Sequence, residues 1–228
     1  MQQHSTIGLL WESDMKANAK FIQNRIKNID GIKYFTEQQI KMLRASVKEL
    51  ADLDQAKGRV TAIREWMVID LITSSGMRVA ETANVRCGDL KIGFSDSEVF
   101  VRCGKGSRSR HIQIPQSLKQ HLALFLKWKQ DQGEATENEA HLFVGQRGPW
   151  TPQAIQQVVK KHLKALGLYE PGRSVHALRH SYAYHVYRRS LDLRAVQILL
   201  GHASVQTTQI YTHASKEDIQ ELIKEIWT

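Results

Sequence analysis

The most informative part of this sequence reads HALRH at residues 176–180, LLGH at residues 199–202 and TTQIYTH at residues 207–213. His176 and Arg179 are three residues apart, so on a helix they share one face. A hydrogen-bonding ring beside a fixed guanidinium suits a phosphoryl group. His176 and His180 are spaced like a metal pair, but no glutamate follows His176 as the HExxH pattern requires, so we expect no metal. A helix with a partly buried histidine is the alternative explanation.

Two segments upstream place a basic side chain close to glycine. Arg78 follows the predicted helix break at Gly76 and has Glu81 three residues further on, within reach of an ion pair. An arginine beside the free N–H groups of a helix N-terminus can bind phosphate, although a surface Arg–Glu pair would give the same pattern. Lys105 lies between two glycines at the tip of a predicted β-hairpin, where a solubilising turn lysine is the alternative.

The remaining sequence predicts a mainly helical fold with a small antiparallel β-sheet, an α+β domain. Apolar residues recur at helical spacing from Val60 to Leu71. The hairpin strands are expected at Val99 to Cys103 and His111 to Ile114. Helix ends are indicated by capping residues, glycine and proline at Thr36, Gly76, Thr151, Pro152, Gly167 and Asp192.

The charge of the chain indicates a polyanionic partner. Its 228 residues carry 32 Lys and Arg against 23 Asp and Glu, a net charge of +9. A strongly basic domain most often binds nucleic acid, although basic charge also serves solubility. Within residues 102–110 three arginines accompany Lys105 without an acidic residue. We expect these arginines and the second histidine of the HALRH segment to contact DNA: Arg102, Arg108, Arg110 and His180.

Composition excludes several classes of protein. Hydrophobic residues make up 42% of the chain, enough for a sizeable core, so global disorder is excluded. No apolar run approaches the roughly 18 residues of a membrane span, and the N-terminus shows no signal peptide. We therefore expect a cytoplasmic protein. Cys87 and Cys103 cannot form a disulfide framework and lack metal-ligand spacing.

Taken in order, these segments resemble the tyrosine recombinases, or phage-type integrases, over about residues 36–228. The later half is similar to the Xer-like branch. The resemblance implies the catalytic-domain architecture of that family, with Tyr211 as the nucleophile and Glu81 as the acidic support of the first catalytic arginine. It assigns the catalytic positions to six residues: Arg78, Lys105, His176, Arg179, His202 and Tyr211.

The chemistry fits this assignment. Cutting DNA without a metal or a high-energy cofactor requires a covalent nucleophile that stores the bond energy, and a tyrosine can form such an intermediate. Charge on the attacked phosphate is stabilised by the arginines Arg78 and Arg179, with His202 as a further donor. His176 is the candidate base for Tyr211. We therefore expect a site-specific recombinase that acts through a 3′-phosphotyrosyl intermediate and needs no cofactor.

The resemblance also implies partners and a domain division. We expect residues 1–35 to form an N-terminal arm with one helix, too short for the family's separate core-binding domain, and residues 36–228 to form the catalytic domain. A C-terminal helix is predicted at residues 216–227, which either packs on its own core or links protomers into a synaptic tetramer. Double-stranded DNA is the expected substrate, and accessory DNA-bending proteins are possible partners. We expect a nucleoid-associated protein of a bacterium, a phage or a mobile element.

Three other functions remain open from the sequence. The same chemistry without a partner strand gives type IB-like DNA relaxation. A DNA-binding regulator, or an inactive remnant that retains the fold, would explain the basic charge but would not require every catalytic position. A histidine-based metalloenzyme predicts stoichiometric metal in the purified protein.

Overall fold

The computed structural model describes residues 34–102 and 109–200, all within one compact unit of the chain. The helices are α2 (Glu37–Ala56), α3 (Thr61–Ser75), α4 (Val79–Ala83), the 3-10 turn η1 (Cys87–Asp89), α5 (Gln116–Asp131), α6 (Pro152–Ala165), α7 (Val175–Ser190) and α8 (Leu193–Leu200). The strands are β1 (Leu90–Lys91), β2 (Glu98–Val101), β3 (Arg110–Gln113), β4 (Val144–Gly145) and β5 (Gly148–Pro149). The helices predicted near the N-terminus and at residues 216–227 lie outside the described residues.

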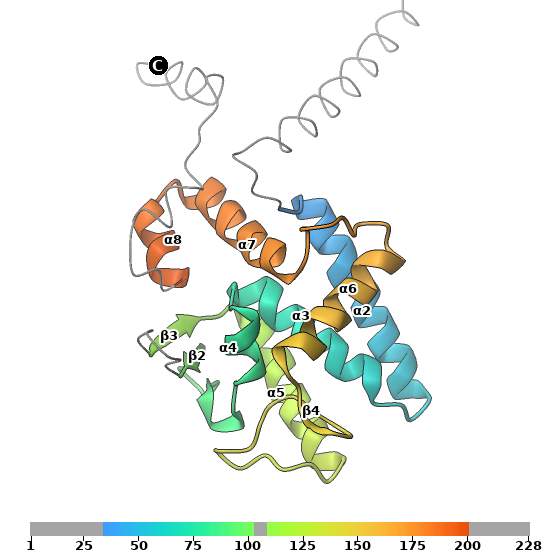
Figure 1. Cartoon of the computed structure of the whole chain (residues 1–228). Coiled ribbons are helices and arrows are strands. Elements are labelled where there is room, and N and C mark those ends of the chain that lie inside the picture. The colour runs from blue at the N-terminus through green and yellow to red at the C-terminus, as the bar shows by residue number, and fades with distance from the viewer. Residues whose placement is uncertain (1–33, 103–108, 201–228) are drawn as a thin grey trace, which may run out of the picture. The chain divides into compact units, whose positions relative to one another are not determined.

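Helix α3 is the central element of the core. Most of its side chains are buried, and α2, α4, α5, α6 and α7 all pack against it. A helix that is buried on nearly every side must be surrounded, and these five helices enclose α3 (Figure 1). It ends at Ser75 because Gly76 takes a left-handed conformation, with φ +65°, and its N–H donates to the Ile72 carbonyl.

The predicted hairpin is present as part of a three-stranded antiparallel sheet in the order β1-β2-β3. Val99 pairs with Ile112, and Val101 pairs with Arg110. Val99, Val101 and Ile112 are buried, so one face of the hairpin packs on the core. Strand β2 begins one residue earlier than predicted, and the tip at residues 103–108 lies outside the described residues. The mainly helical α+β fold class is confirmed.

The local helix signals are also confirmed. Thr36 and Gln39 form a reciprocal capping box, in which each side chain accepts from the other residue's backbone N–H. Thr151 caps α6, with Pro152 in its first turn. The Asp192 carboxylate accepts from two N–H groups at the start of α8, at 2.8 and 3.0 Å.

The folded core begins earlier than the sequence division placed it. Tyr34 and Phe35, assigned to the arm, are 5% and 1% exposed. The Phe35 N–H donates to Ser181 Oγ at 2.7 Å, and the Arg173 guanidinium lies 4.2 Å from the Phe35 ring centroid. The core therefore includes residues that precede α2, because α7 and the loop before it cover them.

In the described part of the chain, no helix is both long enough and apolar enough to cross a membrane.

Candidate functional site

Arg78 lies at the N-terminus of α4, three residues after the end of α3. Its backbone N–H donates to Glu81 Oε2 at 2.8 Å, and its Nη1 donates to Glu81 Oε1 at 2.8 Å. The side chain is 41% exposed. The ion pair expected from the three-residue spacing is therefore present, and it orients a guanidinium that solvent, or a phosphate, can reach.

Arg179 connects three parts of the sequence that the motifs had marked separately. The residue lies in the second turn of α7 and is 6% exposed. Its Nη1 donates to the Gly76 carbonyl at 2.6 Å, and its Nη2 donates to the Leu200 carbonyl at 2.9 Å. Gly76 is two residues before Arg78, and Leu200 is two residues before His202. One buried guanidinium thus ties the Arg78 loop to the end of α8.

The two histidines of the HALRH segment differ in exposure. His176 is exposed in the first turn of α7, whereas His180, one turn later, is partly buried. Burial lowers the pKa of His180, and the nearby His176 and Arg179 lower it further. His180 is therefore neutral at physiological pH, and the DNA contact predicted for it would be a hydrogen bond rather than an ion pair.

Glu81 is the electrostatic centre of this region. Burial raises the pKa of its carboxyl, but hydrogen bonds from Arg110 and from the Arg78 backbone and side chain outweigh burial and bring the pKa to about 2. The Arg110 guanidinium binds both carboxylate oxygens, each at 2.9 Å. Glu81 therefore stays ionised at every pH in which the protein would act.

Two of the arginines predicted to contact DNA have carboxylate partners within the protein. Arg110 is paired with Glu81, and Arg102 donates to Asp89 at 2.8 Å and to both oxygens of Glu139 at 3.0 Å. The sequence showed only their basic neighbours, because Glu81 and Glu139 are 29 and 37 positions away from these arginines. Their role as DNA contacts stays a prediction.

Four predicted site residues lie outside the described residues: Lys105, Arg108, His202 and Tyr211. The structure brings Arg78, Glu81, Arg110 and Arg179 to one region, where α8 packs beside β3 and the hairpin lies next to α4 (Figure 1).

The model of the phage integrase family matches residues 33–218. This chain belongs to the phage integrase family. The match covers most of the sequence and includes every residue to which the resemblance assigned a role.

Two curated relatives illustrate the similarity. The chain is 35% identical over 166 residues to tyrosine recombinase XerA of Pyrococcus horikoshii, covering 71% of this chain and 54% of the relative. It is 39% identical over 184 residues to tyrosine recombinase XerC of Bradyrhizobium diazoefficiens, covering 78% and 56%. The chain thus spans about half the length of the curated relatives that it matches.

Solved structures show the same fold. A crystal structure of XerA recombinase superposes with a TM-score of 0.66 at 28% identity, covering 86% of this chain and 64% of that one. The XerH site-specific recombinase bound to its difH substrate superposes with a TM-score of 0.68 at 24% identity, covering 86% and 55%. These matches confirm the tyrosine recombinase catalytic-domain fold predicted from the sequence.

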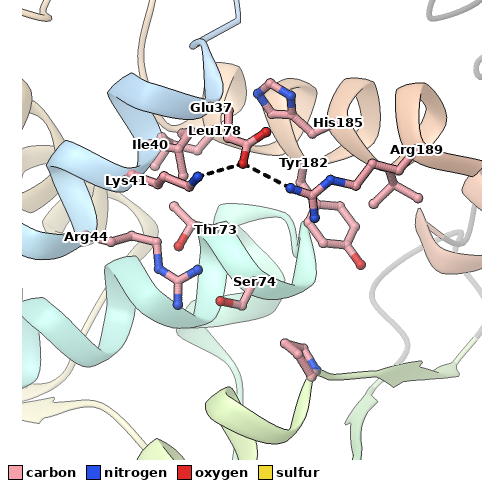
Figure 2. Close-up of a pocket in the computed structure, with 12 residues that line it drawn as sticks. Glu37, Ile40, Lys41, Arg44, Thr73, Ser74, Leu178, Tyr182, His185 and Arg189 are labelled. Atoms are coloured by element: carbon pink, nitrogen blue, oxygen red, sulfur yellow. Dashed lines mark hydrogen bonds and ion pairs between the residues drawn. The ribbon is translucent and has the colours of Figure 1, made fainter.

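A cavity of about 270 Å³ lies between α2, α3 and α7. Its apolar lining includes Ile40, Leu178 and Val186. At its rim Glu37 lies between Lys41 and Arg189 and forms an ion pair with each, at 2.9 and 3.0 Å (Figure 2). Neither Arg78 nor Arg179 lines the cavity, and its rim charges are already paired. A DNA duplex is also far wider than such a cavity, so the cavity cannot hold one.

In residues 34–102 and 109–200, no cluster of three His, Cys, Asp or Glu side chains has the arrangement of a metal site.

Gly76 permits the close approach of α7 to the Arg78 loop, and Gly76→Ala is expected to destabilise the protein. The left-handed backbone costs an alanine about 1 kcal/mol, and the new Cβ would overlap the Tyr182 ring, adding roughly 1–3 kcal/mol. Gly58→Ala is the matched control, since Gly58 has φ +64° but open space around it. Urea denaturation of both variants measures the difference. Equal losses would show that the Tyr182 contact is accommodated without cost.

Proposed function

We propose that this chain is the catalytic part of a site-specific recombinase, which cuts and rejoins duplex DNA through a 3′-phosphotyrosyl intermediate at Tyr211. The observation that carries the proposal is the Arg179 bridge, whose bonds to the Gly76 and Leu200 carbonyls join the segments leading to Arg78 and to His202. A site assembled from distant segments around two guanidiniums suits a phosphodiester, whose charge increases in the transition state.

Each catalytic side chain has a role in this chemistry. Arg78 and Arg179 stabilise the non-bridging oxygens, and His202 adds a hydrogen-bond donor. His176 accepts the proton of the Tyr211 hydroxyl, which attacks phosphorus and displaces the 5′ oxygen. Lys105 donates the proton that this oxygen requires. The 5′ hydroxyl of a second strand then reverses the reaction, so the phosphodiester bond energy is conserved.

The relatives support duplex DNA as the partner, because the XerH structure holds its difH substrate. We assign residues from Tyr34 onward to the catalytic domain and the residues before it to an N-terminal arm. The helix predicted at residues 216–227 would join protomers into a synaptic tetramer, and accessory DNA-bending proteins would assist it. Several protomers would then act together on the same DNA.

Covalent capture tests the proposal. The protein is mixed with sheared genomic DNA of its source, quenched with SDS, and the protein-linked fragments are recovered and sequenced. We expect enriched fragments with the native chain and none with Tyr211→Phe, because phenylalanine has no hydroxyl to attack phosphorus.

DNA binding by both proteins, measured without SDS, is the control for that experiment. Covalent complexes that persist in Tyr211→Phe would exclude Tyr211 as the nucleophile. Binding without any covalent complex in the native chain would favour the regulator function. Covalent complexes that yield relaxed circles but no recombinant joints would favour the topoisomerase-like activity.

A further inference from the structure

Arg110 directs its guanidinium into the protein, not toward solvent. The side chain extends from the first residue of β3 and is 13% exposed, and its partner Glu81 is 12% exposed. The two groups form a bidentate pair, with Nη1 to Oε1 and Nη2 to Oε2 both at 2.9 Å. Such a pair has two parallel hydrogen bonds and a fixed geometry, which hold the carboxylate in one orientation.

Glu81 is shared equally between two arginines. Its Oε1 accepts from Nη1 of Arg78 and Nη1 of Arg110, and its Oε2 accepts from the Arg78 backbone N–H and Nη2 of Arg110. Four hydrogen bonds satisfy the carboxylate, so it has little freedom to rotate. Arg78 is held at the edge of this assembly, with its side chain still 41% exposed.

We infer that Arg110 is a positioning residue for the recombination chemistry, which acts by holding the Glu81 carboxylate in the place where it orients Arg78. The inference rests on the proposed function. Arg110 anchors the carboxylate from β3, a different element from α4, so that Arg78 is tethered to a fixed point rather than to a mobile side chain. Arg110 also offsets the negative charge of Glu81, which would otherwise repel a phosphate bound at Arg78.

The test compares four proteins: the native chain, Arg110→Gln, Arg110→Lys and Arg64→Gln. Arg64 is the matched control because it forms a similarly buried pair with Glu134, a carboxylate that Lys129 also binds. Arg64 lies twelve positions before Gly76, about 18 Å along a helix. The probe is sheared genomic DNA of the source, and the readouts are the rate of SDS-resistant adduct formation and the affinity for DNA without SDS.

We expect Arg110→Gln to slow adduct formation about tenfold or more, while DNA affinity stays within about threefold. The reason is that the variant loses stabilisation of the transition state rather than binding of the DNA. Arg110→Lys should recover part of the rate, because lysine keeps the charge but not the bidentate geometry. Arg64→Gln should stay within about twofold of the native rate, since pairs remote from the site affect stability alone.

The pH profile separates positioning from a general loss of stability. Among the described residues, Glu81 forms ion pairs with Arg78 on its own helix and with Arg110 on β3, and α3 and α6, which also pack against α4, add no further ion pair. Without Arg110 the burial of Glu81 raises its pKa with fewer bonds to oppose it. The adduct rate of Arg110→Gln, relative to the native chain, should therefore fall further between pH 8 and pH 5.5, and adding Glu81→Gln should remove that pH dependence.

Three results would overturn the inference: a native adduct rate in Arg110→Gln, a rate loss matched by an equal loss of DNA affinity, or the same rate loss in Arg64→Gln. The second would identify Arg110 as a direct DNA contact. If the native chain forms no Tyr211-dependent adduct, the proposed function fails instead. The Arg110–Glu81 link is then judged by melting temperature, where Arg110→Gln and Glu81→Gln should be strongly non-additive.

Discussion

Arg179→Gln is expected to abolish covalent DNA cleavage, with a loss of about 10³-fold or more in rate, the scale of an arginine that stabilises a transferring phosphoryl group. Glutamine has no charge and cannot donate to both the Gly76 and Leu200 carbonyls, which are 2.6 and 2.9 Å from the guanidinium. The variant therefore loses transition-state stabilisation and the bridge between α3 and α8 together. Arg179→Lys should also be strongly impaired, because one ammonium group cannot reproduce the planar fork.

Arg173→Gln is the matched control for that experiment. The Arg173 guanidinium is largely buried and also bonds a backbone carbonyl, that of Tyr34, at 2.7 Å; its side-chain partners are Gln39 at 2.8 Å and Glu170 at 3.4 Å. It joins the loop before α7 to the start of α2, away from Arg78. Both variants should lose roughly 1–3 kcal/mol of stability from unpaired carbonyls, but only Arg179→Gln should lose cleavage. Equal cleavage losses would show that Arg179 acts through stability alone.

The sequence predicts those parts of the fold that depend on neighbouring residues. The Thr36 cap, the Gly76 break and the Asp192 cap are short-range signals, because each depends on a hydrogen bond to a backbone group within four positions. The Val99–Ile112 pairing follows from two strands close in the chain. The strands β1, β4 and β5 were not predicted, since each has only two residues and no alternation can be recognised over that length.

The candidate site depends even more than the fold on contacts between residues far apart in the sequence, which the sequence does not predict. The resemblance identified Arg78 and Arg179 as residues of one site, but their connection through the Gly76 carbonyl spans 103 positions and carries no local signal. Arg110 was interpreted from its basic neighbours, whereas its partner Glu81 lies on a different element. Charge near a motif therefore predicts the type of ligand better than it predicts which individual cations contact that ligand.

Glu81 pairs with both Arg78 and Arg110, so the stability of the protein at acid pH measures the strength of these ion pairs. Because the pKa of Glu81 is about 2 in the folded protein and 4.5 in the unfolded reference, its contribution to stability is fully present above pH 4.5 and is lost as pH falls toward 2. A difference of this size corresponds to about 3 kcal/mol. Glu65 and Glu134 also have lowered pKa values, because cationic hydrogen-bond partners outweigh their burial, and they add to acid instability.

Glu81→Gln is therefore expected to lower the free energy of unfolding by about 3 kcal/mol at pH 7, since it leaves the buried Arg110 without a counter-charge. The loss relative to the native chain should shrink as pH falls from 4.5 toward 2, because the native Glu81 becomes protonated over that interval. Urea denaturation at a series of pH values measures both effects. Glu37→Gln is the control, because Glu37 pairs with Lys41 and Arg189 at an exposed surface, where salt screens the interaction and little stability is at stake. A pH-independent difference between Glu81→Gln and the native chain would show that the carboxylate is not held ionised by its two arginines.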